Sequence, residues 1–252
     1  SRNVGIPTGS TDNENTKKDS TSSVKKSKKL DTNLTTTNGN TMSIVKSDKE
    51  NVVHIKNSWY VIDPEANLAN TRVNMKKCID PYAKLYQWEG YVGEVPAESI
   101  VKRNHEHNEL FIYCGHGGGS CMIKDLSILK SYESCPASML WGCSSGVLIR
   151  YGVHDPTGII ISYLNQGAPF ILGNLWDVTE KDIDTLSICF INQFLSSCSV
   201  NKNCSREPGI LSESSVENKS GFMMNAPRSS CKLKHAVGSA PVMYGIPMNI
   251  AK

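Results

Sequence analysis

The chain has no long hydrophobic run, and no stretch approaches the roughly 18 consecutive apolar residues that a membrane-spanning helix needs. Its first residues also lack the apolar core of a signal peptide, so we expect neither secretion nor a membrane partner. Residues 1–50 contain no aromatic residue and no cysteine, and only 8 of them are apolar. Such a segment cannot bury enough apolar surface to offset its ordering entropy. We therefore predict a polar, basic, disordered linker over 1–50 and a folded domain over 51–252, with 196–221 as a surface loop.

The folded part has no excess charge of one sign. Residues 1–50 carry 9 Lys and Arg against 6 Asp and Glu, whereas 51–252 carry 18 of each, so the net charge of +3 belongs to the linker. Lys25, Lys26, Lys28 and Lys29 are its densest basic cluster, which indicates a solvated linker or, as the alternative, a localisation signal. Because phosphate neutralisation needs clustered basic residues, we expect no direct nucleic-acid partner for the domain.

The nine cysteines show no repeated spacing of the kind that a disulfide framework has. Without a secretion signal, reduced thiols and a cytoplasmic or nuclear setting are the better interpretation. Each cysteine is then either a residue of the hydrophobic core or part of a reactive site.

Three short apolar runs, at 110–114, 137–141 and 169–172, predict strands buried on both faces. Helical patterns near 125–130, 155–164 and 180–195 follow them in turn. The other expected elements are a strand within 52–62, helices at 65–78, from 96 onward and at 226–237, and a last strand at 242–244. This alternation predicts an α/β fold with a mainly parallel sheet covered on both faces.

Functional residues of parallel sheets gather beyond the carboxyl ends of the strands, and the three predicted strands end near His116, Cys143 and Asp177. The first two lie within the glycine-rich segments 115–119 and 142–146. A cysteine attacks as its thiolate, which a nearby imidazole can generate. The backbone N–H groups of Gly117 and Cys143 are candidates for binding an oxyanion. Either residue alone has a structural explanation, as a turn histidine or a buried cysteine, but the pair predicts a Cys–His dyad.

Other chemistries fit the same residues less well. Segment 116–119 and Ser144 match the oxyanion loop and nucleophile elbow of a serine hydrolase, but too few residues separate them for that fold. Cys114, His116 and Cys121 follow no common zinc spacing. The glycine loop also lacks the Gly-Lys-Ser/Thr of a phosphate-binding loop. We therefore predict no metal and no cofactor.

A cluster of acidic residues follows the third strand, and two interpretations of it stay open. Asp177, Glu180, Asp182 and Asp184 lie where negative charge complements a helix dipole, an effect of about 0.3–1 kcal/mol each. Alternatively, they form a carboxylate pocket for a cationic side chain, best an arginine held by two hydrogen bonds. The second interpretation gives a protease a preference for a basic residue before the cut bond.

These motifs resemble those of separase, the family of cysteine endopeptidases in the caspase-like clan that cleaves the kleisin subunit of cohesin at anaphase. The similarity extends over nearly all of 58–247, and its segments are 59–60, 63–64, 67–71, 110–119, 142–146, 174–184, 231–234 and 240–247.

The resemblance implies a caspase-like three-layer α/β/α sandwich. It implies His116 as general base, Cys143 as nucleophile and cleavage after Arg in an acidic context. Asp184 is then the expected arginine ligand, with Asp177 and Trp176 as further substrate-binding residues.

The same resemblance implies partners and a setting. They are the cohesin kleisin subunit as substrate, a securin-like inhibitor that occupies the cleft as a pseudosubstrate, and the upstream helical and protease-like regions of a full-length chain. The expected location is the nucleus and cytoplasm, including the spindle or centrosome. The alternative function is a non-catalytic module that holds a securin-like peptide in the same cleft, although a binder needs neither residue of the dyad.

Overall fold

The computed structural model describes residues 52–124, 128–196 and 224–251, which belong to one compact unit. The predicted linker at 1–50 lies outside the described residues. So does the predicted surface loop at 196–221, except for Ser196, which ends a helix.

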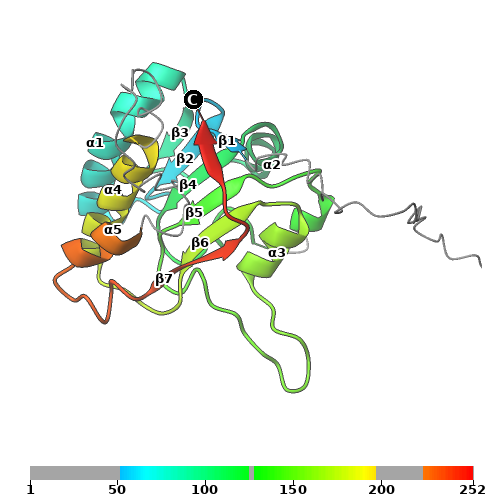
Figure 1. Ribbon diagram of the computed structural model, residues 1–252. Coiled ribbons are helices and arrows are strands. Elements are labelled where there is room, and N and C mark those ends of the chain that lie inside the picture. The colour runs from blue at the N-terminus through cyan, green and yellow to red at the C-terminus, as the bar shows by residue number, and fades with distance from the viewer. Residues whose placement is uncertain (1–51, 125–127, 197–223, 252) are drawn as a thin grey trace, which may run out of the picture. The chain divides into compact units, whose positions relative to one another are not determined.

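A six-stranded sheet forms the centre of the unit (Figure 1). Its strands follow the order β3, β2, β4, β5, β6 and β7, and every neighbouring pair is parallel except β6 and β7. Their bounds are Glu89–Val92, Ser58–Ile62, Leu110–Cys114, Ala137–Leu140, Phe170–Asn174 and Pro241–Gly245. A separate parallel pair joins β1 (Val52–His54) to β8 (Asn249–Ala251). The predicted mainly parallel α/β fold is confirmed.

The central strands are buried along their whole length because helices cover both of their faces. All five residues of β4 are buried, with Leu110, Ile112 and Cys114 in one hydrophobic cluster. Phe111 and Tyr113, whose side chains point the other way, belong to the second cluster. This alternation is the two-faced burial that a continuous apolar run predicts.

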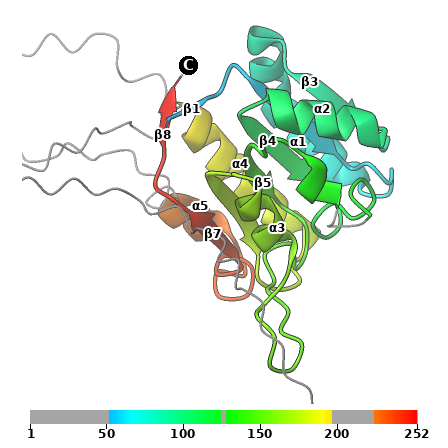
Figure 2. The ribbon, with the colours of Figure 1, turned by 90° about the vertical axis from the view of Figure 1, so that its right-hand side faces the viewer.

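The helices form two layers, one on each side of the sheet (Figure 2). One layer contains α1 (Ala69–Tyr86), α4 (Glu180–Ser196) and α5 (Asn225–Ser230). The other contains α2 (Glu98–His107), the short helix η1 (Ile128–Ser131) and α3 (Ile159–Asn165). None of the helices in the described part of the chain is long and apolar enough to cross a membrane.

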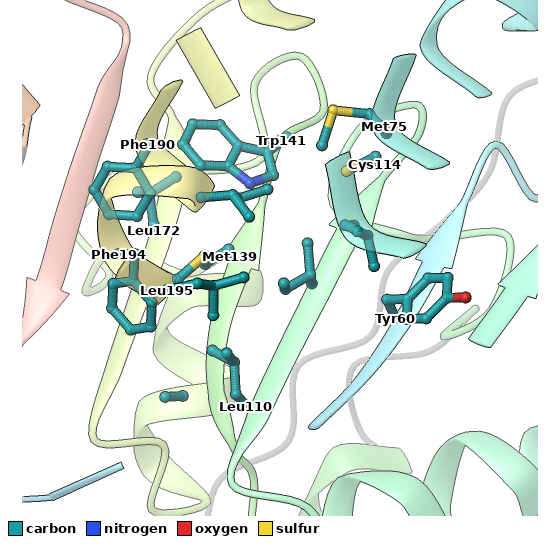
Figure 3. Packing of buried hydrophobic residues seen from close by; sticks show 14 of the residues in the cluster. Tyr60, Met75, Leu110, Cys114, Met139, Trp141, Leu172, Phe190, Phe194 and Leu195 are labelled. Atoms are coloured by element: carbon teal, nitrogen blue, oxygen red, sulfur yellow. The ribbon is translucent and has the colours of Figure 1, made fainter. Parts of the chain in front are cut away.

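The first layer packs on the sheet through large side chains (Figure 3). Trp141 meets Phe190 of α4 edge to face, with ring centroids 5.5 Å apart. Met75 of α1 and Cys114 of β4 belong to the same buried cluster. This packing fixes α1 and α4 relative to the ends of β4 and β5.

The structure differs from the sequence prediction where tertiary packing outweighs local pattern. The first helix continues past the predicted end near 78 and through Pro81, because Ile79 and Ala83 continue its buried face. The strand expected within 52–62 is two strands in different sheets. The predicted helix at 226–237 ends at Ser230. Strands β3 and β8 were not expected, because neither has an apolar run or a fully buried residue.

Candidate active site

The loops that follow β4 and β5 touch at the carboxyl edge of the sheet. A Cβ atom on Gly142 would lie 2.0 Å from the carbonyl oxygen of Gly117 and 2.5 Å from that of Gly115. Only glycine permits this approach, because backbone atoms cannot move aside as the end of a flexible side chain can. The backbones of the two glycine-rich segments, which carry His116 and Cys143, are therefore in direct contact.

His116 and Cys143 line one pocket of about 140 Å³ at this edge. The remaining lining residues come from the end of β4, both loops, the start of α1, the segment between β6 and α4, and α4 itself. They are Leu68, Thr71, Cys114, Gly115, Trp141, Gly142, Val178, Glu180, Ile183, Asp184 and Ser187. The structure thus places the predicted nucleophile and general base at the same cavity.

The backbone of Val178 holds the Cys143 thiol. The sulfur donates to the Val178 carbonyl oxygen at 3.4 Å, and the Val178 N–H approaches the sulfur at 3.5 Å. The next residue, Ser144, has a φ of +52°, in the left-handed region that non-glycine residues seldom adopt. Both backbone polar groups of Val178 therefore contact the sulfur and fix the position of the Cys143 side chain.

A buried polar network below the pocket fixes the turn that carries Cys143. The Ser145 hydroxyl lies 2.8 Å from the carbonyl oxygens of both Leu140 and Gly142 and accepts the Asn174 backbone N–H at 3.0 Å. The Asn174 side chain also donates to the Gly142 carbonyl oxygen at 2.9 Å. Sequence reasoning assigned no role to Ser145 or Asn174. The available signal was a polar residue at the end of β6, Asn174, and a serine inside the glycine-rich segment after β5.

The histidine has a side-chain partner that the sequence pattern did not indicate. Nε2 of His116 lies 2.9 Å from Oδ1 of Asn67, and the Tyr113 hydroxyl donates to the His116 carbonyl oxygen at 2.7 Å. The following Gly117 has a φ of +55° and open space at its Cα. Among the described residues, neither the Gly117 nor the Cys143 backbone N–H has a hydrogen-bond acceptor, so both are available to a ligand.

The acidic cluster separates into different roles in the structure. Glu180 and Asp184 line the pocket. Asp177 accepts the Ser144 hydroxyl at 2.6 Å, and Asp182 accepts the Leu233 backbone N–H at 2.9 Å. Only two of the four carboxylates therefore face the cavity that contains Cys143.

Asp184 is buried, with 5% of its surface exposed. Its carboxylate accepts the Thr71 hydroxyl at 2.9 Å and the Asn74 amide at 3.4 Å. Burial raises the pKa of Asp184, and the charge of Glu180 adds to this effect. No Lys or Arg pairs with Asp184 within the described ranges. The pocket thus contains a desolvated acid that lacks an internal cation there.

Trp176 and Asp177 lie beside the Cys143 turn but do not line the pocket. The Ser144 N–H donates to the Trp176 carbonyl oxygen at 3.2 Å. The Trp176 indole, 41% exposed, donates to the Ala236 carbonyl oxygen at 2.5 Å. The two residues thus connect the turn that carries Cys143 to the segment that precedes β7.

The geometry argues against the two alternative sites, a serine hydrolase and a metal site. The Ser144 hydroxyl donates to Asp177 and not to a histidine, which removes the base that a serine nucleophile needs. In the described part of the chain, no three His, Cys, Asp or Glu side chains come together as a metal site. The seven described cysteines are all free thiols.

A mainly parallel sheet between two helical layers, with a pocket at the carboxyl ends of its strands, is the arrangement of the caspase-like fold. Comparison with known proteins agrees. The sequence profile of the family "Separin, protease domain" matches residues 14–183. That range includes His116, Cys143 and Asp177 and ends one residue before Asp184.

Curated relatives show the same similarity. The chain is 32% identical to the separin of Mus musculus over 198 residues and 35% identical to that of Saccharomyces cerevisiae over 194 residues. These matches cover 77% and 75% of the chain, but 8% and 11% of the two relatives. A solved Saccharomyces cerevisiae separase–securin complex superposes with a TM-score of 0.64 at 30% identity, over 80% of this chain and 13% of that one.

The chain belongs to the separin protease-domain family. The predicted caspase-like fold class is thereby confirmed. The matched region is a small part of each relative, about a tenth of its length.

Proposed function

We propose that the chain is the peptidase part of a separase, with Cys143 as nucleophile and His116 as general base. One observation supports this most strongly: His116, Cys143 and the buried acid Asp184 line a single pocket. The proposed reaction is endopeptidase cleavage of a protein after an arginine.

In the proposed mechanism the Cys143 S–H proton passes to His116, and the thiolate attacks the carbonyl carbon of the scissile bond. The Gly117 and Cys143 amides stabilise the resulting oxyanion. His116 then gives its proton to the leaving amine, which releases one fragment and leaves a thioester on Cys143. A water that loses its proton to His116 cleaves the thioester and releases the second fragment with a new carboxylate.

Asp184 is the proposed ligand for the arginine before the cut bond. Its carboxylate is desolvated and has no cationic partner among the described side chains, so a guanidinium restores a favourable charge balance. The apolar wall of the pocket, formed in part by Leu68, Val178 and Ile183, suits the methylene stem of an arginine. Asp177 and Trp176 are proposed to contact substrate at the rim and not in the pocket.

A covalent probe tests the dyad. A peptide of the form Glu-x-x-Arg with an electrophilic warhead at its carboxyl end is incubated with the chain, and the adduct is located by mass spectrometry. We expect labelling at Cys143 that disappears in His116→Ala and persists in the control Cys121→Ser. Labelling at other cysteines refutes the assignment. Binding of the peptide without any labelling establishes the non-catalytic peptide-binding module instead.

The arginine pocket is tested by affinity. Asp184→Asn is expected to weaken binding of the arginine peptide by more than about 2 kcal/mol, because the guanidinium loses its buried partner. Asp182→Asn is the matched control, since Asp182 lies two residues away on the same helix and accepts a backbone N–H outside the pocket. Unchanged affinity in Asp184→Asn together with a loss in Asp177→Asn transfers the role to Asp177.

The proposed substrate is the kleisin subunit of cohesin, and the proposed inhibitor is a securin-like pseudosubstrate. The solved complex of a 30% identical separase with securin supports the second proposal. Upstream helical and protease-like regions of a longer chain are the further proposed partners, with action in the nucleus and cytoplasm, including the spindle or centrosome. Cleavage of purified kleisin by the chain, abolished in Cys143→Ser, is the direct test.

A further inference from the structure

The loop between β2 and α1 is closed by one buried carboxylate. Asp63, 1% exposed, accepts the backbone N–H groups of Asn67 and Leu68, each at 3.0 Å. Its second oxygen accepts Nε and Nη2 of Arg72 at 2.8 and 2.6 Å. The Asp63 N–H donates to the Cys114 carbonyl oxygen at 2.7 Å. The loop is therefore tied to α1 and to the end of β4, two residues before His116.

This loop adopts a costly backbone conformation. Asp63 and Ala66 have φ angles of +49° and +59°, and the left-handed region costs a non-glycine residue about 1–2 kcal/mol. Such strain persists only where surrounding contacts enforce it, and it concentrates at functional sites. Here the ion pair between Asp63 and Arg72, with two hydrogen bonds to one carboxylate oxygen, supplies those contacts.

The loop conformation places the Asn67 side chain against the His116 ring. The Asn67 Oδ1 atom is 2.9 Å from His116 Nε2, and no other described side chain hydrogen-bonds to that ring. An amide oxygen only accepts, so Nε2 must carry a proton in this contact. In the neutral imidazole, Nδ1 is then the nitrogen with a free lone pair.

We propose that Asn67 is a positioning residue that sets the tautomer and orientation of His116, and that Asp63 and Arg72 hold Asn67 in place. The inference rests on the proposed function of His116 as general base. Asn67 does not itself line the pocket, and its side chain contacts the lining residue His116, so it acts through that histidine. The contact from Asn67 to His116 matches the general requirement that a catalytic base be oriented by a further group besides the nucleophile.

The test measures alkylation of Cys143 by iodoacetamide across pH, read at that residue by mass spectrometry. Asn67→Ala is expected to slow alkylation near neutral pH by about tenfold or more, the scale of a misplaced reacting group. Asn67→Asp keeps an acceptor on Nε2–H, and its charge favours the imidazolium. We therefore expect it to retain the maximal rate of alkylation and to move to higher pH the limb of the profile that His116→Ala removes. Asn165→Ala, an exposed asparagine at the end of α3, is the control and should leave the profile unchanged.

The outcomes separate the two proposals. If His116→Ala slows alkylation and Asn67→Ala does not, the positioning role is wrong and the general base stands. If His116→Ala has no effect, the proposed function fails as well. Should Asn67→Ala not fold, the ¹⁵N spectrum of the wild-type imidazole decides: a proton on Nε2 of His116 supports the inference, and a proton on Nδ1 overturns it.

Discussion

A buried histidine on the far side of the sheet makes the stability of this fold depend on pH. His105 of α2 has no exposed surface and lies against the rings of Trp59 and Phe111, with centroids 5.2 and 5.0 Å away. Its Nδ1–H donates to the Val101 carbonyl oxygen at 2.9 Å, and Nε2 accepts the Tyr163 hydroxyl at 2.7 Å. Both nitrogens are satisfied in the neutral ring, so a proton added to Nε2 breaks this pairing.

Burial lowers the pKa of His105 from 6.5 to about 4. The unfolded chain therefore binds a proton on this residue as the pH falls through 6.5, whereas the folded chain stays neutral until about pH 4. The free energy of unfolding must decrease over that window, because the unfolded state binds more protons. At 1.36 kcal/mol per pKa unit, the loss attributable to His105 is about 2 kcal/mol between pH 7 and pH 5.

Urea unfolding followed by tryptophan fluorescence at pH 7, 6 and 5 measures this loss, and His105→Gln is the comparison. Glutamine does not titrate, so the wild type should lose about 2 kcal/mol more than the variant over the range. Asp184, whose pKa is raised in the fold, stabilises the folded state as the pH falls. This contribution is the same in the wild type and in the variant, so it cancels in the comparison. Equal losses in the two proteins would refute the conclusion that His105 stays neutral in the fold.

Three further perturbations have defined outcomes. Gly142→Ala places a Cβ atom 2.0 Å from a backbone oxygen, so we expect a loss of more than about 2 kcal/mol in stability and of Cys143 labelling by the warhead peptide. Thr71→Val removes a hydroxyl donor to Asp184, so the pKa of Asp184 rises further and affinity for the arginine peptide falls roughly tenfold, measured by calorimetry. Trp176→Phe removes the indole donor to the segment before β7, so hydrogen exchange over 232–240 should accelerate while warhead labelling persists.

The first two perturbations have a control variant, and the third has a refuting outcome. Gly167→Ala meets no atom within 4 Å and costs only about 1–2 kcal/mol for its left-handed φ, with labelling intact. Thr185→Val removes a hydroxyl that donates to a carbonyl oxygen on the same helix, so the affinity should not change. Equal exchange rates in Trp176→Phe and wild type would show that the indole hydrogen bond does not hold the segment.

The central strands were predictable because burial on both faces imposes an apolar run. β4, β5 and β6 all show it, and their ends identified the residues of the site. β3 did not show it, since it lies at the sheet edge and contains Gly90 against the Tyr60 ring. The antiparallel direction of β7 was equally hidden, because strand direction depends on the path of the chain and not on local composition.

The candidate site was predictable where its chemistry is local. His116 and Cys143 each stand in a glycine-rich segment directly after a strand, and parallel neighbours must place such ends together. Asn67 was not identifiable as a partner, since 49 positions separate it from His116 and its own neighbourhood contains several asparagines. The same holds for Thr71, which approaches Asp184 across 113 positions.

The sequence by itself determined the class of fold and which two residues carry the proposed chemistry, because hydrophobic periodicity and glycine placement are read along the chain. Only the tertiary structure decided which carboxylates share the pocket: four acids near one helix start look alike in sequence, but the helix turns Glu180 and Asp184 inward and leaves Asp177 and Asp182 to hold loops. Only the tertiary structure also showed that Asn67 contacts the His116 ring and orients it. Both depend on contacts between distant segments, which form only when helices and strands pack.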